Sequence, residues 1–141
     1  MIILDTNVIS ALMSQTPEIV VQNWLDRQPR ISVWTTSITI FEIRFGLNLM
    51  PAGKRREQLE QAFERLCGVI LENRIAEFGA SAAYFAAEIQ AGRKQSGSNV
   101  EMRDTMIAGT ARASGATLAT RNVRDFQSAG IDIVDPWKSA A

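Results

Sequence analysis

The sequence predicts an α/β fold with a short, mostly parallel central sheet and helices on both of its faces. Short β-branched or apolar runs alternate with longer segments of helical periodicity, and turn-forming residues separate them. No repeat, low-complexity tract or long linker divides the 141 residues. A chain of this length can bury roughly two-thirds of its unfolded surface, so we expect a single domain over residues 1–141.

An apolar strand and two helices open the chain. Residues 2–4 form an apolar run that stops at polar residues, which predicts a buried strand. Apolar residues then recur at helical spacing over residues 8–13. Thr16 followed by Pro17 is typical of an N-cap and a first-turn proline, which predicts a second helix ending near Arg27.

A second strand and two more helices follow. The β-branched and aromatic residues 31–35 predict the strand. Thr36 or Ser37 would cap the next helix, which must end before Pro51. After a basic loop, a further helix has one apolar face, formed by Leu59, Phe63 and Leu66.

The next segments again alternate. The apolar run 69–71 predicts a third strand. The alanine-rich residues 80–95 predict a helix, which the Ser-Gly-Ser-Asn sequence at 96–99 interrupts. A helix over about 100–114 follows, with Gly115 at the position of a helix-terminating glycine.

Two strands are expected near the end of the chain, at residues 117–120 and 131–134, with a short turn or helical segment over 121–126 between them. In parallel α/β sheets, ligands bind in the crevice beyond the carboxyl ends of the strands. Polar residues at those ends are therefore the candidates for function.

The residue inventory restricts the chemistry. The chain has no His and a single Cys, Cys67, which excludes Ser–His and Cys–His triads, internal disulfides and zinc sites built from His or several Cys. Carboxylates, hydroxyls and amides remain, and oxygen ligands suit Mg²⁺ or Mn²⁺. A balance of 15 Lys and Arg against 15 Asp and Glu argues, by itself, against a strongly basic nucleic-acid binder. Without a signal-like start or a long apolar run, we expect a cytoplasmic protein with no membrane segment.

Four acidic residues lie at or near the predicted carboxyl edge of the sheet. Asp5 ends the first strand, Glu42 lies early in the helix after the second, and Asp125 follows the strand at 117–120. Asp104 lies at the start of a helix that can bring it to the same edge. Clustered carboxylates repel one another and imply a bound cation or raised pKa values. Mg²⁺ or Mn²⁺ is the simplest occupant, because no nitrogen or sulfur cluster is available.

Each acid also has a purely structural interpretation. Asp5 can cap the next helix, Asp104 can interact favourably with a helix N-terminus, and Asp125 can belong to a turn. Glu42 is expected to point toward apolar surroundings, where a carboxylate needs a partner. By spacing it shares a helix face with Ile38, Phe45 and Leu49. The apolar residues around this helix and the first one are interpreted as core, namely Ile9, Leu12, Met13, Phe45, Leu49 and Met50.

Four segments together resemble a known family. They are IILDTNVIS at the start, SITIFEIRFG from Ser37, DTMIAGTA from Asp104, and ATRNVRDF followed by DPW. Their order and spacing over essentially the whole chain resemble the PIN-domain family, and more narrowly the VapC/FitB-type toxins of bacterial type II toxin–antitoxin systems. The resemblance implies an endoribonuclease that hydrolyses RNA phosphodiester bonds with acid-bound Mg²⁺ or Mn²⁺.

Site residues can be carried over from this resemblance by position. Asp5, Glu42 and Asp104 fall on the three core acids, with Asp5 and Asp104 expected to anchor the principal metal. Thr6 and Asn7 fall on the polar residues beside the first acid, where they would orient ligands or a water molecule.

The fourth acidic position is ambiguous. Some family members have Asp where Asn122 stands, and others have the acid three residues later, as at Asp125. Asn122 can still coordinate through its amide oxygen, but without charge. The resemblance therefore leaves the occupancy of a second metal site open.

The same resemblance suggests partners. It implies a homodimer and a cognate VapB/FitA-like antitoxin, with operator DNA bound only through that antitoxin. Since the site acids account for part of the acidic total, the rest of the chain is net basic. Arg121, Arg124 and Arg103 are the expected RNA phosphate contacts, and their alternative is a solvated, partly ion-paired surface.

Two other functions remain open at this point. One is a FitB-like partner module with little or no nuclease activity. The other is an aspartate-dependent phosphotransferase, which requires a further acid in the first motif or a suitably placed Lys downstream. The motif reads Asp5-Thr6-Asn7, and no Lys lies between Lys94 and Lys138, which disfavours the phosphotransferase.

Overall fold

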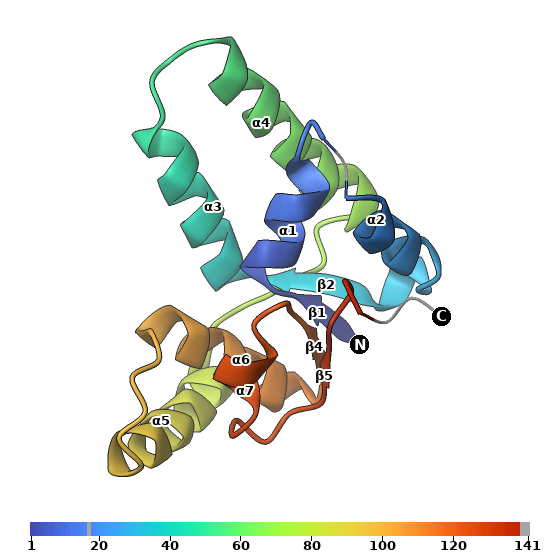
Figure 1. Ribbon diagram of the computed structural model, residues 1–141. Coiled ribbons are helices and arrows are strands. Elements are labelled where there is room, and N and C mark those ends of the chain that lie inside the picture. Colours follow the sequence, from blue (N-terminus) through green and yellow to red (C-terminus); the bar gives the residue numbers. More distant parts are fainter. Residues whose placement is uncertain (17, 139–141) are drawn as a thin grey trace.

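The computed structural model describes residues 1–16 and 18–138, and its centre is a five-stranded parallel sheet (Figure 1). The strand order is β3-β2-β1-β4-β5, and every neighbouring pair is parallel. The strands are β1 (Ile2–Leu4), β2 (Val33–Thr36), β3 (Ile75–Ala76), β4 (Thr117–Ala119) and β5 (Ile133–Val134). All five carboxyl ends therefore lie along one edge, with β1 at the centre.

Helices cover both faces of the sheet, as the sequence predicts. The seven described α-helices are α1 (Thr6–Met13), α2 (Ile19–Asp26), α3 (Ser37–Leu49), α4 (Lys54–Arg65), α5 (Ala80–Gln95), α6 (Met102–Ser114) and α7 (Val123–Phe126). Figure 1 shows α1 to α4 on one side of the sheet and α5 to α7 on the other. None of the helices in the described ranges combines the length and apolar character that a membrane crossing needs.

Two apolar cores result from the alternation of side chains along the strands. Leu4 and Ala119 pack with α1 to α4, whereas their neighbours Ile3 and Leu118 pack with α5 to α7. Because both faces of the central strands are buried, apolar residues make up all of β1 and most of β4. This explains why β1 and β4 are recognisable in the sequence.

The helices α5 and α6 pack unusually closely through small residues. A Cβ atom added at Gly109 would lie 2.6 Å from the main-chain oxygen of Ala82 and 2.7 Å from Cβ of Ala86. Only glycine permits this approach. Gly115 ends α6 in the left-handed conformation, with φ of 62°, as expected from the sequence. The packing sets the position of the α6 N-terminus, which carries Asp104.

The strand predicted at residues 69–71 is wrong. The chain continues from α4 into a π-helical turn, Leu66–Ile70, in which the Leu71 amide donates to the Leu66 carbonyl oxygen. Val69 is 60% exposed, so the run is not the buried strand that its composition suggests. A short apolar run does not distinguish a strand from a helical segment. The third strand is β3 instead.

Several predicted boundaries also differ. A 3-10 turn, Arg30–Ser32, precedes β2, and Ile31 is 78% exposed. The second helix begins at Ile19 with Glu18 as its N-cap residue, so Thr16 is not the cap. Pro17 lies outside the described residues.

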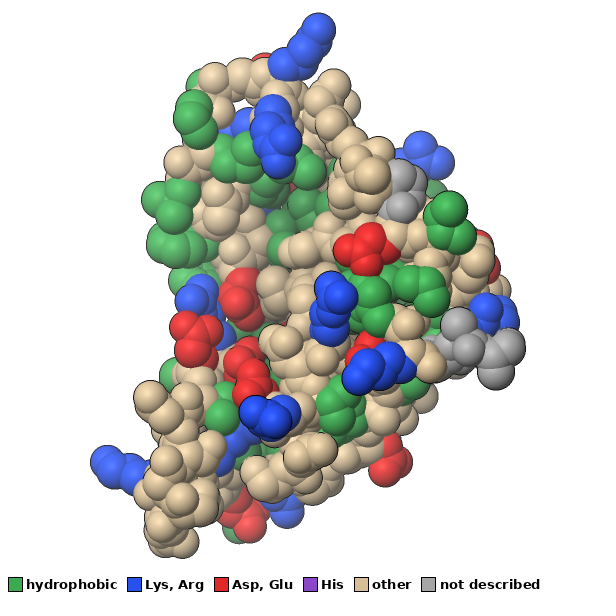
Figure 2. Space-filling view, in the orientation of Figure 1, with side chains coloured by type: hydrophobic (Ala, Val, Ile, Leu, Met, Phe, Trp, Pro, Cys, Tyr) green, Lys and Arg blue, Asp and Glu red, His purple; other side chains and the backbone are tan. Residues whose placement is uncertain are grey.

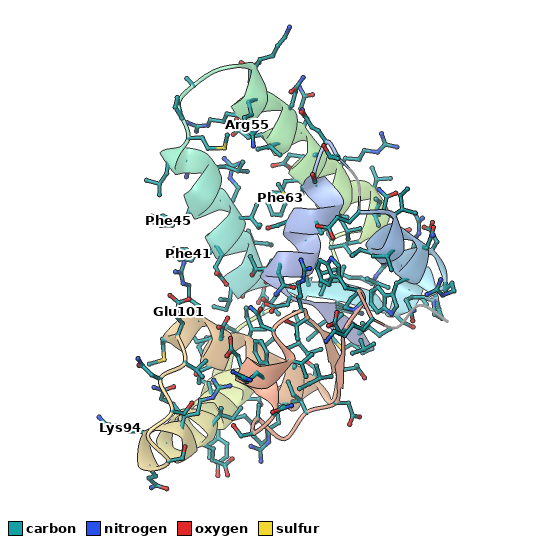
Figure 3. The ribbon with its side chains drawn as sticks, in the orientation of Figure 1. Phe41, Phe45, Arg55, Phe63, Lys94 and Glu101 are labelled. Atoms are coloured by element: carbon teal, nitrogen blue, oxygen red, sulfur yellow. The ribbon has the colours of Figure 1, made fainter. Side chains whose placement is uncertain are left out.

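The predicted core face of α3 is partly wrong. Its buried residues are Thr39, Ile43 and Leu47. By contrast, Phe45 is 49% and Leu49 is 71% exposed. The helix packs on α1 and α4 through the buried face, and Phe41 and Phe45 stack on its outer side with ring centroids 5.9 Å apart (Figure 3). Helical spacing alone cannot say which of two apolar faces meets the rest of the protein.

Candidate functional site

Asp5 lies at the carboxyl end of β1 and is 3% exposed. Its Oδ1 accepts a hydrogen bond from the Thr6 amide at 2.8 Å, and so it caps α1. Its Oδ2 accepts hydrogen bonds from the Thr120 hydroxyl at 2.7 Å and from Asn7 Nδ2 at 3.4 Å. Both carboxylate oxygens are therefore oriented by fixed donors, and the capping interpretation is correct.

A chain of hydroxyl groups leads from β2 to Glu42. Thr6 Oγ1 donates to Glu42 Oε1 at 3.1 Å and lies 3.1 Å from Thr39 Oγ1. Thr39 Oγ1 in turn accepts from Thr36 Oγ1 at 3.2 Å. Because each hydroxyl has one proton, the consistent order of donation runs from Thr36 through Thr39 and Thr6 to Glu42. This arrangement orients the Glu42 carboxylate toward the α1 N-terminus.

Asp104 and Arg103 reach the site from α6. Asp104 is half-buried in the first turn of α6. The Arg103 guanidinium lies 4.0 Å from Glu42 Oε2 and 3.9 Å from Glu101 Oε1. Arg103 therefore stands beside the predicted acids, where it balances part of their charge.

The four predicted acids are electrostatically coupled through Asp5 and Asp104. Burial raises the pKa of Asp5; hydrogen bonds from Thr120 and Thr6 oppose this rise, while the charges of Glu42 and Asp125 add to it. Burial raises the pKa of Asp104 to about 6, and Asp5, Glu42 and Asp125 contribute to that rise. Figure 2 shows acidic side chains gathered between the two helical layers, with basic side chains beside them.

The donor chemistry and charge of this cluster fit a divalent cation. The acids supply only oxygen ligands, and their mutual repulsion is what a cation would relieve. Within residues 1–16 and 18–138, no three acidic side chains stand close enough together to enclose an ion directly. The fit therefore depends on charge and ligand type, and ligation would require the half-buried Glu42 and Asp104 side chains to move.

The polar residues after β4 join the same network. Asn7 Nδ2 donates to Thr120 Oγ1 at 3.2 Å, and Asn7 Oδ1 accepts from the Arg121 amide at 3.2 Å. The Asn122 amide donates to Thr120 Oγ1 at 3.0 Å. Asn122 itself is exposed, whereas Asp125 is half-buried in α7 and acts electrostatically on Asp5 and Asp104.

The predicted RNA-contacting arginines lie in different surroundings. The Arg121 guanidinium lies over the Trp137 ring, 4.8 Å from its centroid. The Trp137 indole N–H donates to Glu18. Arg124 is exposed on α7. Arg121 is thus held at the carboxyl edge of the sheet, while Arg124 is free to reorient at the surface.

Sequence reasoning missed Thr120, Thr39 and Arg93. Thr120 is fully buried, and its role follows from the register in which Leu4 pairs with Ala119, because the next residues are Asp5 and Thr120. The position of Thr120 as the last residue of the strand predicted at 117–120 was the available signal. Arg93 carried no such signal, since it lies in a helix with a mixed pattern.

A cleft of about 330 Å³ extends from the acidic site between α1, α3 and α4. Thr6 and Glu42 line the end near the acids, and Arg103 borders it. The remaining lining is largely apolar, formed by Met13, Ile43, Leu47 and Leu59 together with Ser10 and Gly46. The site therefore continues into a surface suited to an apolar side chain or helix.

Comparisons with known proteins agree with this geometry. The family model described as PIN domain matches residues 2–131. The chain is 41% identical to the VapC ribonuclease Y4jK of Sinorhizobium fredii over 99% of this chain and 100% of that protein. It is 34% identical to toxin FitB of Neisseria gonorrhoeae, over 97% and 99% of the two chains.

Solved structures show the same similarity. The crystal structure of FitAcB from Neisseria gonorrhoeae superposes with a TM-score of 0.84 and 34% identity, over 98% of this chain and 99% of that one. DNA-bound VapBC from Salmonella typhimurium superposes with a TM-score of 0.76 and 26% identity, over 96% and 97% of the two chains.

Proposed function

The chain belongs to the PIN domain family, and on this premise we propose that it is a metal-dependent endoribonuclease, the toxin of a VapBC-like type II toxin–antitoxin system. The observation that carries the proposal is the gathering of Asp5, Glu42, Asp104 and Asp125 near the carboxyl edge of a parallel sheet, where the charges of neighbouring acids add to the raised pKa values of Asp5 and Asp104. Relatives that match 99% and 95% of the chain are named VapC ribonuclease and tRNA(fMet)-specific endonuclease VapC.

Asp5, Asp104 and Glu42 would hold the metal, with Asp125 orienting a ligand or the attacking water. A bound Mg²⁺ or Mn²⁺ lowers the pKa of a coordinated water and stabilises charge on a phosphodiester, so no histidine base is needed. The protein's contribution is preorganisation. Thr120 and the Thr6 amide fix the Asp5 carboxylate, and the hydroxyl chain ending at Thr6 fixes Glu42.

Arginine side chains around the acids would bind the RNA backbone. Arg121 is already held against Trp137, so its side chain would lose less conformational entropy when it binds a phosphate. Arg103 borders the cleft beside Glu42, and Arg124 lies exposed on α7. Phosphate contacts of this kind position a strand without reading its sequence.

The cleft beside Glu42 and the exposed residues of α3 support a partner. Two homologous structures carry the names FitAB and VapBC and are described as bound to DNA. We propose that a VapB/FitA-like antitoxin covers this surface and that operator DNA is bound only through it. A homodimer, a single domain over residues 1–141 and a cytoplasmic location belong to the same proposal.

The alternative, a FitB-like partner with little or no nuclease activity, has less support. All four acids are present, and the FitB relative is less similar than the relative named a VapC ribonuclease, at 34% against 41% identity. The alternative is supported by Asn122, which is uncharged where some family members have an acid. The half-buried Asp125 supplies an acid three residues later.

An RNA cleavage assay with Mg²⁺ and Mn²⁺ tests the proposal. We expect Asp5→Asn to lose more than about 100-fold in rate, since residues that only support metal ligands already contribute about 10–100-fold. Asp132→Asn is the matched control, because Asp132 is exposed and precedes β5 at the opposite edge of the sheet. Equal cleavage by wild type and Asp5→Asn would refute the assignment, and antitoxin binding without any cleavage would favour the alternative.

A further inference from the structure

Arg93 is a buried charged residue that has no role in the proposed reaction. It lies near the end of α5 and is 4% exposed. In the described part of the chain, Arg93 and Asp5 are the two ionisable residues that are buried. A buried guanidinium is costly unless its surroundings compensate it.

The Arg93 guanidinium joins three helices behind the acidic site. Its Nη1 donates to Thr105 Oγ1 at 2.6 Å, and its Nη2 donates to the main-chain oxygen of Asp125. Thr105 Oγ1 in turn donates to Gln90 Oε1 at 2.9 Å. Arg93 is therefore bonded to the residue after Asp104 on α6 and to Asp125 itself on α7.

No carboxylate neutralises Arg93 directly. Within the described ranges it forms no ion pair, and its Nε has no hydrogen-bond partner. Burial lowers the pKa of Arg93, while the charges of Asp104 and Asp125 counteract this effect. The compensation for the buried cation thus comes from its hydrogen bonds to Thr105 and to the Asp125 main-chain oxygen, and from the nearby charges of the Asp104 and Asp125 carboxylates.

Packing alone does not require a charge at this position. An uncharged side chain of similar size could fill the same space, although only a donor could keep the hydrogen bonds to Thr105 and to the Asp125 main-chain oxygen. Phe126, which is fully buried, already anchors α7 to the core. What the charge of Arg93 adds to these bonds is its interaction with the Asp104 and Asp125 carboxylates.

We propose that Arg93 is a positioning residue of the acidic site, whose guanidinium is a permanent counter-charge behind Asp104 and Asp125 that limits how tightly the site binds a divalent cation. This inference depends on the proposed function only in assuming that the acids bind such a cation. Arg93 bonds to the Thr105 hydroxyl and the Asp125 main-chain oxygen, and within the described residues it forms no ion pair with the carboxylates that would bind the metal.

Mn²⁺ titration of the metal-free protein by calorimetry tests this role. One unit charge acting on a divalent ion at roughly 8 Å changes its affinity by about fivefold even at the dielectric constant of water. We expect Arg93→Met to bind Mn²⁺ at least about fivefold more tightly than wild type, and Arg93→Lys to stay within about twofold because it retains the charge. Arg112→Met is the control, since Arg112 pairs with Glu88 on the outer side of α5 and α6; its affinity should be unchanged.

Arg93→Gln serves if Arg93→Met does not fold, because a neutral amide can still donate to Thr105 or to the Asp125 carbonyl oxygen. Unchanged or weaker Mn²⁺ binding by the folded neutral variants would overturn the inference. The proposed function fails separately, if wild type binds no Mn²⁺ or if Asp5→Asn binds it equally well.

Discussion

The Thr120 hydroxyl should contribute more to the free energy of unfolding than a buried hydroxyl usually does. It donates to Asp5 Oδ2 at 2.7 Å and accepts from the Asn122 amide and from Asn7 Nδ2. Thr120→Val keeps the shape of the side chain and removes all three bonds. A hydrogen bond to a charged group contributes about 1.5–3 kcal/mol. The groups that lose Thr120 as a partner add little to this cost, because Asn122 is exposed to water and Asn7 still donates to Asp5.

We therefore expect Thr120→Val to lower the free energy of unfolding by about 2 kcal/mol, or the melting temperature by about 6–10 °C. Because Asp5 also loses a donor that orients its carboxylate, Mn²⁺ affinity should fall by about tenfold. Thermal unfolding and calorimetric Mn²⁺ titration measure the two effects. Thr120→Ser, which retains the hydroxyl, should restore most of both.

Thr110→Val is the matched control. Thr110 is also buried, but its hydroxyl donates to the main-chain oxygen of Met106 within α6, at 2.8 Å, and touches no acid. Its loss should cost less than about 1 kcal/mol and leave Mn²⁺ affinity unchanged. If Thr120→Val were as stable as Thr110→Val and bound Mn²⁺ like wild type, Thr120 would not fix Asp5.

Two further predictions concern pH and packing. The pKa of Asp104 in the folded protein, about 6, exceeds its ordinary value of 3.8, so the metal-free protein should lose stability as pH rises from about 4 to 6. Thermal unfolding in EDTA should show a decline to which Asp104 contributes about 1–2 kcal/mol, allowing for solvent screening. Asp104→Asn should reduce the decline by this amount, while the raised pKa of Asp5 maintains the rest; an equal decline in that variant would contradict the prediction. Gly109→Ala would press a Cβ against Ala82 and Ala86 and should cost about 1–3 kcal/mol in urea denaturation. Gly92→Ala, on an open side of α5, should be neutral or stabilising, and similar losses in both variants would argue against the close packing.

The strands β1 and β4 were predictable because burial on both faces produces a short run of mainly apolar residues in the sequence. Ile2–Leu4 and Thr117–Ala119 are short apolar runs that end in polar residues, as fully buried parallel strands do. Asp5 follows the first run directly, so its place at the carboxyl edge followed from the strand prediction. Glu42 lies beside Thr6, the residue after Asp5, and its role in the site stays a prediction.

The errors have a common origin in contacts between elements. Residues 69–71 are as apolar as a strand, but they continue a helix because Leu66 and Leu71 can reach the core from helical geometry. Phe45 and Leu49 have the spacing of a core face, but α3 turns Ile43 and Leu47 inward instead. Composition and periodicity do not encode which face another element will cover.

By itself, the sequence restricted the chemistry and located its candidate residues along the chain. A chain without His, and with one Cys, would have to hold a metal mainly through oxygen ligands, and acids at or near strand ends are expected at one edge of a parallel sheet. Only the tertiary structure decided what stands beside each acid. Thr120, 115 positions from Asp5, meets it through strand register, and Arg93 lies behind Asp104 and Asp125 through helix packing. Such pairings depend on how surfaces fit in three dimensions, whereas periodicity fixes only the spacing within one element.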